Sequence, residues 1–497
     1  MDAKPLKPKG YPNPLDENRL RHVLDSSGLF PEYFEGHKSR LEQKFVMLAV
    51  SGAFNSGYHA LIEAGDWRSL AYLIPAIEWA MQNGERVVVS TNTTNLQEQL
   101  AEKDVPAILS ALGVEARAAV MKGKSRYLCP LRLNDLRRSG LKTQDEVRLL
   151  TKILIWLPSA LTGDGDELFT PAPGERAAFV RLSAQDPACS MSTCSATDCY
   201  LNLARRQAES AYVVTVNHAL LLADIAMENR ALPEYHYLVV GEAHHLEAAA
   251  TDSLAYRVDR DELLHQLGDL LSTSGCRATG LLVAVTYYIG AFLPPSRSKI
   301  VWGMCDQPAN DLTRMAYQVT DFFDRLLDFL ADRGGGESSE YPQRTRITRS
   351  LRNEPGWIRV ESTFMTLRTE MVAFASDLVG LLPISDEVID VDTGIAGGSR
   401  KTLDALKARA QMAKRYTDEA IKQMTEVTVK PSEQRTYWIE VGVPPDYDHT
   451  HVTLNASLQQ VGPFLRKFLW DTKKSVILTS ATMRTATPST KGERTFT

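Results

Sequence analysis

Four short and continuously apolar runs, widely separated along the chain, constrain the fold more than any other feature of the sequence. A polar turn follows each of them. The runs occupy residues 59–63, 87–90, 238–240 and 475–479. Continuous apolarity is typical of strands that are buried on both faces of a parallel sheet. Helical patterns at 70–81 and 95–103 follow the first two runs, so the sequence predicts a doubly wound α/β domain.

The long intervals between the predicted strands indicate two large insertions into this α/β domain. The first, residues 122–211, contains four of the six cysteines. The second, residues 254–435, is expected to be mainly helical, because apolar residues recur with helical spacing between 312 and 330 and residues 400–427 resemble one long helix. The remaining segments are the three pieces of the α/β domain, an N-terminal segment and a disordered tail. Their expected bounds are 32–121, 212–253 and 436–485 for the domain, 1–31 for the N-terminal segment and 486–497 for the tail.

Composition and charge narrow the class of protein. The chain has 497 residues, of which 44% are hydrophobic and 24% charged, as is ordinary for a globular protein. Its net charge of −5 provides no overall basic field, so any binding of nucleic acid must come from a local patch. The longest apolar stretch is too short to span a bilayer, and the N-terminus lacks the apolar core of a signal peptide. We therefore expect a cytoplasmic protein with no membrane partner.

Four cysteines follow the spacing C-x59-C-x4-C-x4-C, at Cys129, Cys189, Cys194 and Cys199. Structural zinc sites usually use more closely paired cysteines, so this spacing suits zinc poorly. Four thiolates on loops and helix ends suit a [4Fe–4S] cluster better. The alternative is a set of unrelated buried thiols. The polar sequence around the last three cysteines favours the cluster, because such a stretch cannot form a core by itself.

Basic and aromatic residues flank the first cysteine. They include Lys122, Lys124, Arg126 and Tyr127. Lysines and arginines that neutralise phosphates, together with rings that stack on bases, are typical of surfaces that bind single-stranded nucleic acid. The alternative for the charges is a solvated helix face.

Several motifs occur in a characteristic order. A predicted strand ends in Gly-Glu-Ala-His-His at 241–245, which would be a DEAH box if aspartate stood at Gly241. The other motifs are RVVVSTNTTNLQEQL at 86–100, GKSRYLCPLRL at 123–133, VVTVNHALLLAD at 213–224 and SVILTSATM at 475–483. Together they resemble the DinG-like and XPD-like iron–sulfur DNA helicases of superfamily two. The resemblance extends over about residues 32–485.

The resemblance implies a RecA-like first motor domain of the P-loop NTPase type, interrupted by an iron–sulfur domain and a helical arch domain. Family members use ATP and Mg²⁺ to move along single-stranded DNA, typically 5′ to 3′. The resemblance assigns Glu242 to the attacking water, with His244 beside it in the DEAH-like motif. It also implies that the DNA-binding residues include Thr91, Gln97, Asn217 and His218, in addition to the basic and aromatic residues before Cys129.

The phosphate-binding motif departs from the family pattern. The family has EAGTGTGKS where this chain has EAGDWRS at 63–69, so two residues and the lysine are missing. Backbone N–H groups of a glycine-rich loop normally enclose the phosphates, and Asp66 would place an anion among them. Trp67 would fill the same space. Gly65, Arg68 and Ser69 remain as the remnant of the nucleotide site, with Arg68 a poor substitute for lysine.

Two further departures concern the same reaction. Gly241 stands where the family has the aspartate that helps to hold Mg²⁺. The second motor domain should follow Thr482 and is not expected in this chain. We therefore predict a truncated homologue with impaired ATPase activity. We expect it to retain the binding of single-stranded DNA and a [4Fe–4S] cluster. The alternatives are an active helicase whose second motor is supplied by another chain, and a decayed gene product.

Overall fold

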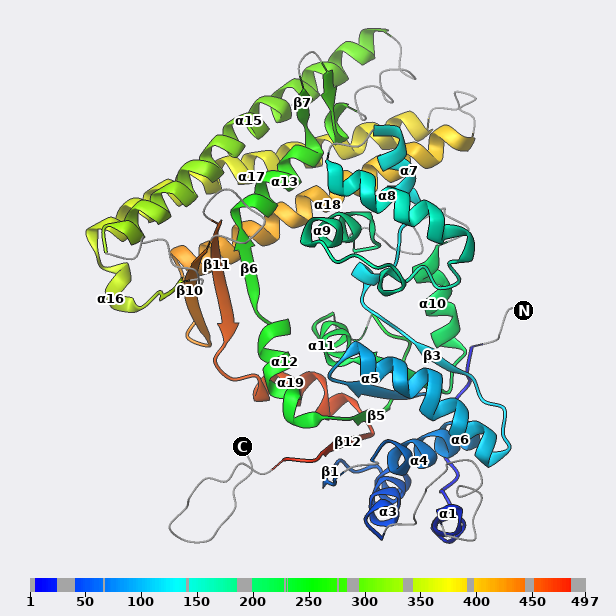
Figure 1. Ribbon diagram of the computed structural model, residues 1–497. Coiled ribbons are helices and arrows are strands. Elements are labelled where there is room, and N and C mark those ends of the chain that lie inside the picture. Colours follow the sequence, from blue (N-terminus) through cyan, green and yellow to red (C-terminus); the bar gives the residue numbers. More distant parts are fainter. Residues whose placement is uncertain are drawn as a thin grey trace. The chain divides into compact units, whose positions relative to one another are not determined.

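The computed structural model describes residues 5–24, 41–65, 68–139, 143–185, 199–227, 229, 231–274, 277–283, 295–333, 343–390, 397–442 and 451–483. These residues form two compact units (Figure 1). The first unit holds the described residues up to Gln185, those from Cys199 to Leu254, and those from Gln460 onward. The second unit holds those from Ala255 to Gln459.

The first unit is built on a six-stranded sheet in which every neighbouring pair is parallel, with the order β1-β12-β5-β2-β4-β3. All four predicted strands are present, and the α/β class is confirmed. The strands β3 and β4 complete the sheet and were not among the predicted ones. The bounds are β1 Ala60–Glu63, β2 Val87–Thr91, β3 Ala118–Val120, β4 Val213–Asn217, β5 Tyr237–Val240 and β12 Ser475–Ser480.

Helices pack on the sheet around an aromatic core. The ring of Phe54 lies 5.3 Å from that of Tyr237 on β5, and Trp79 lies 4.9 Å from the same tyrosine. Phe54 belongs to α3 (Leu41–Ser56), and Trp79 belongs to α4 (Arg68–Asn83), which matches the helix predicted at 70–81. The helix predicted at 95–103 is α5 (Thr94–Gln99) continued by a π-helical turn, Leu100–Asp104. Further helices of this sheet region are α1 Glu17–Val23, α6 Val105–Leu112, α11 His218–Ala226, α12 Leu246–Ser253 and α19 Gly462–Phe468.

The part of the first insertion that the structure describes has a small core of its own within the first unit. Leu149 and Ile153 are fully buried there beside Phe179. We call this segment, residues 122–185 and 199–209, the cysteine segment. Its helices are α7 Pro130–Ser139, α8 Gln144–Trp156, α9 Pro173–Leu182 and α10 Tyr200–Glu209, with short 3₁₀ turns at Lys124–Arg126, Leu157–Ser159 and Gly165–Glu167.

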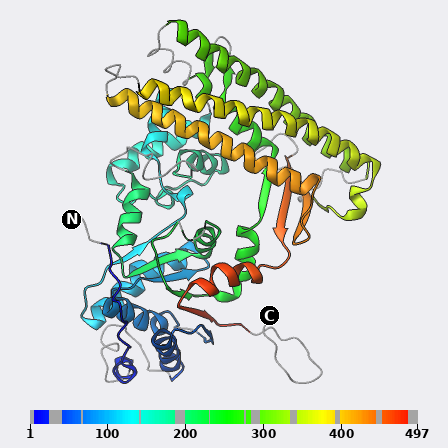
Figure 2. The same cartoon turned by 180° about the vertical axis from the view of Figure 1, so that it is seen from behind.

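The second unit combines three long helices with an antiparallel sheet (Figure 2). Helix α17 packs against both α15 and α18, and the buried rings of Phe322, Trp357 and Phe364 belong to its core. The sheet order is β6-β11-β10-β9. The helices are α13 Arg260–Leu270, α15 Pro295–Ala331, α16 Arg349–Arg352, α17 Pro355–Asp390 and α18 Gly397–Thr428. The strands of the sheet are β6 Tyr256–Asp259, β9 Gln343–Arg346, β10 Arg435–Gly442 and β11 His451–Leu458. A separate pair of strands is β7 Ser272–Ser274 and β8 Arg277–Thr279.

One predicted boundary is wrong. The sequence assigned residues 436–485 to the α/β domain, but β10 and β11 pair with β6 and β9 in the second unit. The sequence-based division at 435 did not anticipate this pairing, because the partners of β10 and β11 lie far away in the sequence. The described helices include none that is both long and apolar enough to cross a membrane.

Candidate nucleotide and nucleic-acid sites

The turns that follow the parallel strands all lie at the carboxyl edge of the six-stranded sheet. In parallel α/β sheets this edge is where ligands bind. The turn after β1 begins with Ala64 and Gly65, and Gly241 and Glu242 follow β5. Ser480 ends β12, which lies between β1 and β5. The remnant phosphate loop and the DEAH-like motif are thereby brought to one edge of the sheet, as the motifs predicted.

Hydrogen bonds tie the ends of these three strands together. His244 Nδ1 lies 2.6 Å from Ser480 Oγ and 3.6 Å from Glu242 Oε2. The backbone N–H of Ala64 donates to the carbonyl of Ser480 at 2.9 Å. The His244–Ser480 pair joins two motifs that are 236 residues apart in the chain. This contact could not be predicted from the sequence, because it depends on the position of β12 beside β5 in the sheet.

Glu242 has a left-handed backbone conformation, with φ of 50°. Such a conformation is uncommon for a residue other than glycine and is often found at functional sites. Its side chain is half-buried, so the carboxylate stays accessible beside His244. The geometry keeps the one acid of this motif at the carboxyl edge.

Gly241 has room for a side chain. Its N–H donates to the carbonyl of Ser90 at 2.8 Å. A Cβ built on Gly241 would lie 3.4 Å from the Tyr72 hydroxyl and 3.6 Å from that carbonyl, both close to ordinary contact distances. Packing therefore does not require glycine here, and the missing carboxylate is a chemical difference rather than a steric one.

The remnant phosphate loop is only partly described. Gly65 is exposed, whereas Asp66 and Trp67 lie outside the described residues. Arg68 begins α4, and its side chain also lies outside the described part. The Ser69 side chain is hydrogen-bonded to Asp104; burial raises the pKa of that carboxyl and this bond opposes the rise. The Ser69 hydroxyl of the predicted nucleotide site is thus engaged with Asp104, which ends the helical turn Leu100–Asp104.

The predicted DNA-binding residues on β2, α5 and β4 lie mostly in the interior, which corrects that part of the prediction. Gln97 is fully buried, and its Nε2 donates to the carbonyls of Met121 and Thr215 at 2.7 and 2.8 Å. Thr91 is buried and donates to the Thr93 carbonyl. Asn217 caps α11 by accepting from the Leu220 N–H. These three side chains form hydrogen bonds with backbone groups of the protein itself, and Asn217 is the one that is only partly buried.

His218 is also an interior residue. It is 1% exposed, and its Nδ1 lies 2.7 Å from the Ser90 hydroxyl. Burial lowers the pKa of His218 to about 4, because the charged imidazolium loses its hydration. The ring is therefore neutral at pH 7, and its hydrogen bond joins the first residue of α11 to β2.

The basic residues before Cys129 fall into two groups. The Lys122 side chain is 7% exposed and is surrounded by carboxylates, and Tyr127 is buried with its hydroxyl accepting from the Lys122 N–H at 3.0 Å. Burial raises the pKa of Tyr127 to about 12. These two were expected to contact DNA, and their burial corrects that expectation. Lys124 is half-buried and Arg126 is 49% exposed, so these two cations are the accessible part of the predicted patch.

Two of the four predicted cluster ligands are described. Cys129 immediately precedes α7 and is half-buried, with its N–H donating to the Leu182 carbonyl at 2.9 Å. Cys199 is the N-cap of α10 and is buried. Cys189 and Cys194 lie outside the described residues. Both described cysteines therefore lie at the start of a helix of the cysteine segment.

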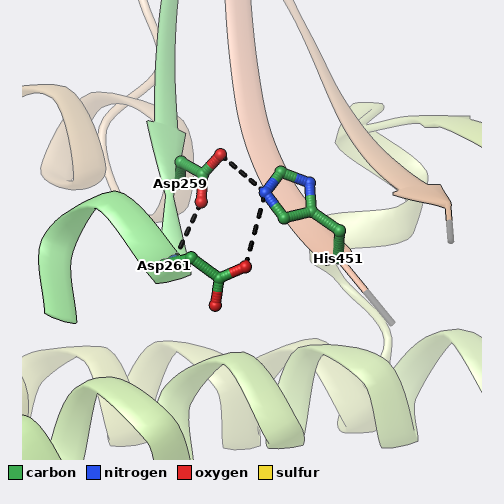
Figure 3. Close-up of side chains that lie close together, drawn as sticks. All are labelled: Asp259, Asp261 and His451. Atoms are coloured by element: carbon green, nitrogen blue, oxygen red, sulfur yellow. Dashed lines mark hydrogen bonds and ion pairs between the residues drawn. The ribbon is translucent and has the colours of Figure 1, made fainter. Parts of the chain in front are cut away.

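A second group of potential ligands lies in the second unit (Figure 3). Asp259 ends β6, Asp261 is in the first turn of α13, and His451 begins β11. The Nε2 atom of His451 is 2.8 Å from Asp259 Oδ2 and 3.6 Å from Asp261 Oδ2. The Arg257 guanidinium donates to Asp259 Oδ2 at 3.1 Å and lies 3.3 Å from His451 Nδ1. The Arg257 guanidinium already compensates the carboxylate charge. These side chains are therefore better explained as a polar cross-link between β6 and β11 than as a metal site.

No protein-family profile matches the chain. Three curated proteins share sequence with about half of it. The 3′-5′ exonuclease DinG of Bacillus subtilis (strain 168) is 33% identical over 244 residues, 48% of this chain and 26% of that protein. The ATP-dependent DNA helicase YoaA of Haemophilus influenzae is 29% identical over 262 residues, 51% and 40% of the two chains. The ATP-dependent helicase DinG of Mycobacterium tuberculosis is 34% identical over 245 residues, 44% and 36%.

A solved structure described as an XPD helicase aligns with 90% of this chain and 59% of its own, at a TM-score of 0.37 and 10% identity. The first unit is a parallel α/β unit with Glu242, His244 and Ser480 at the carboxyl edge of its sheet. The curated matches show that the chain is a relative of the DinG- and YoaA-type helicases, which confirms the resemblance drawn from the motifs. The matched part spans less than half the length of each of these relatives.

Proposed function

We propose that this chain is a DinG-like helicase homologue that binds single-stranded DNA and has lost most or all ATP hydrolysis. The observation that carries the proposal is Gly241, which leaves the carboxyl edge of β5 without its expected metal-binding carboxylate although a Cβ has room there. On this proposal the six-stranded sheet is the first motor, residues 122–211 are the iron–sulfur region and the second unit is the arch.

The chemistry of phosphoryl transfer supports the loss of hydrolysis. Such a site stabilises the transferring phosphoryl group with Mg²⁺, a phosphate loop and positioned donors. Here the loop lacks its lysine, residue 241 has no carboxylate, and the Ser69 side chain is bonded to Asp104. Each missing electrostatic group typically costs about 3 kcal/mol of transition-state stabilisation, so the losses together exceed a factor of about 10⁴ in rate.

The cysteine segment supports a [4Fe–4S] cluster bound by Cys129, Cys189, Cys194 and Cys199. The two described cysteines lie at the starts of α7 and α10. When bound, such a cluster crosslinks the segment through four Fe–S bonds and gives it a redox-active centre. The residues of the chain hold the cluster in place; Cys129 is itself anchored by its hydrogen bond to the Leu182 carbonyl.

DNA binding rests on Lys124 and Arg126, which are the accessible cations before Cys129. Cations that neutralise phosphates release counterions, so the affinity should fall with salt. The direct test is fluorescence anisotropy of a labelled single-stranded oligonucleotide at several salt concentrations, together with a DNA-stimulated ATPase assay. Salt-dependent binding without ATP hydrolysis is the expected result.

A second candidate is an active helicase whose second motor is supplied by another chain. The retained cluster of Glu242, His244 and Ser480 favours this candidate, because these groups remain connected at the carboxyl edge. DNA-stimulated ATPase activity that disappears in Glu242→Gln would support it and would contradict the first proposal.

A further inference from the structure

Three carboxylates converge on one lysine at the junction between the sheet and the cysteine segment. Lys122 Nζ lies 2.5 Å from Glu98 Oε1 and 3.2 Å from Asp166 Oδ2, and it also forms an ion pair with Asp164 Oδ2. One oxygen from each of the three acids lies within 4.8 Å of the other two. Oxygen groups spaced in this way could share a divalent cation, but the ammonium group occupies the position between them.

The carboxylates belong to different parts of the first unit. Glu98 lies on α5, and its neighbour Gln97 anchors that helix to the carbonyl of Met121, just after β3, and to that of Thr215 in the middle of β4. Asp164 and Asp166 belong to the turn around Gly165–Glu167 in the cysteine segment. Lys122 directly follows Met121, where the chain leaves the sheet. The ammonium therefore connects the sheet to a turn that is 42 residues further along the chain.

The acids are oriented independently of the lysine. Asp164 Oδ1 accepts from the Asp166 N–H at 3.0 Å, which leaves Oδ2 for the ammonium. Burial acts to lower the pKa of Lys122, but the hydrogen bonds and charges of the acids outweigh it and raise that pKa above its ordinary value. Lys122 therefore stays charged at neutral pH. Because Arg126 also pairs with Asp166, loss of the Lys122 ammonium would leave Glu98 and Asp164 without their ion-pair partner, whereas Asp166 would keep one.

The chain after Lys122 depends on this junction. The Tyr127 hydroxyl accepts from the Lys122 N–H, and Tyr127 and Leu128 form isolated bridges with Asp164 and Ser183. Cys129 comes next. The position of this cysteine is thus set by short links that begin at Lys122.

We infer that Lys122 acts as the internal cation of a three-carboxylate site that fastens the cysteine segment to the sheet. Lys122 is a positioning residue and does not contact nucleic acid. This inference does not depend on the proposed function, because it concerns how the segment is held, whatever the segment binds.

The test is cation rescue in the full chain. Lys122→Ala should lower the melting temperature by about 5 °C or more, because a buried charge loses its partner. Millimolar Ca²⁺ should restore most of that loss relative to a sample with chelator, and calorimetry should detect Ca²⁺ binding that wild type lacks. Adding Glu98→Gln to the variant should remove the Ca²⁺ effect, since one of the three ligand carboxylates is neutralised.

Lys152→Ala is the matched control. Lys152 lies in the same segment and pairs with one carboxylate, Glu175, at 2.6 Å. Its loss should destabilise the protein without creating a response to Ca²⁺. An equal Ca²⁺ response in the Lys122 and Lys152 variants, or an unchanged melting temperature in Lys122→Ala, would overturn the inference.

If Lys122→Ala does not fold, a triple variant tests the inference. Neutralising two of the acids with Glu98→Gln and Asp166→Asn should then restore soluble protein, because the repulsion between carboxylates is removed. Continued aggregation of that triple variant would also contradict the inference.

Discussion

His244 Nδ1 and Ser480 Oγ are 2.6 Å apart, so the turn after β5 is bonded directly to the end of β12. β12 reaches this position only after the chain has completed the whole second unit. The contact therefore connects the acid-bearing turn of Glu242 to the last described strand. It would survive the loss of nucleotide chemistry, because neither side chain needs a ligand to keep the bond.

We predict that the His244–Ser480 bond contributes measurably to stability. His244→Ala and Ser480→Ala should each lower the free energy of unfolding by about 1 kcal/mol. The double variant should cost less than the sum, with a coupling of about 0.5 kcal/mol or more in urea unfolding. His245→Ala leaves the bond in place and is the matched control; additive losses for His244 and Ser480 would show that the bond is not formed.

The burial of His218 predicts a specific dependence on pH. Its folded pKa of about 4 lies below the ordinary value near 6.5, so the folded state binds fewer protons than the unfolded state between these values. Stability is then fully present above about pH 6.5 and falls by up to about 3 kcal/mol as the pH drops toward 4. His218→Asn should flatten this part of the profile of stability against pH, whereas substitution of the exposed His265 should not. Identical profiles for the wild type and both variants would contradict the lowered pKa of His218.

Lys124 and Arg126 should account for part of the salt dependence of DNA binding. Replacing both with alanine should weaken binding to single-stranded DNA and reduce the slope of log K against log salt by about 1.4, since each phosphate contact contributes about 0.7. Arg349→Ala, which removes an exposed cation of the second unit, serves as the control. An unchanged slope in the double variant would place the DNA elsewhere.

The cysteine assignment predicts iron in the purified protein. Anaerobically purified wild type should contain about four iron atoms per chain, and Cys129→Ser or Cys199→Ser should lose them. Cys276 and Cys305 lie outside the spacing pattern, so the variants Cys276→Ser and Cys305→Ser should keep the iron. A protein that contains zinc in place of iron would contradict the cluster.

The sequence predicted the central sheet well because its signal is local. The runs ending at Ser90 and Val240 form strands that are buried along their whole length, as continuous apolarity predicts. The run ending at Glu63 instead forms the edge strand β1, in which alternate residues are exposed. β3 was missed because it has only three residues, and the β10–β11 pair was placed in the wrong unit because pairing partners are set by long-range contacts.

The functional side chains were harder to predict, since burial of a polar residue depends on distant partners. Lys122 carries the same charge as Arg126 and lies four positions away. Lys122 is enclosed by acids from α5 and from the turn at 164–166, whereas Arg126 pairs with Asp166 of that turn and is 49% exposed. Gln97 likewise was expected to face DNA and is instead bonded to two carbonyls of the sheet edge. Motif membership identified where these residues lie along the chain, but not which way they point.

The most direct test of the central claim is calorimetric titration of ATP with Mg²⁺ into the wild-type protein and into Gly241→Asp. The account predicts no wild-type binding tighter than about 1 mM, which corresponds to about −4 kcal/mol. It also predicts no DNA-stimulated hydrolysis for either protein, because Gly241→Asp restores only one of the missing groups. Micromolar binding of MgATP by wild type, with hydrolysis that Glu242→Gln abolishes, would contradict it.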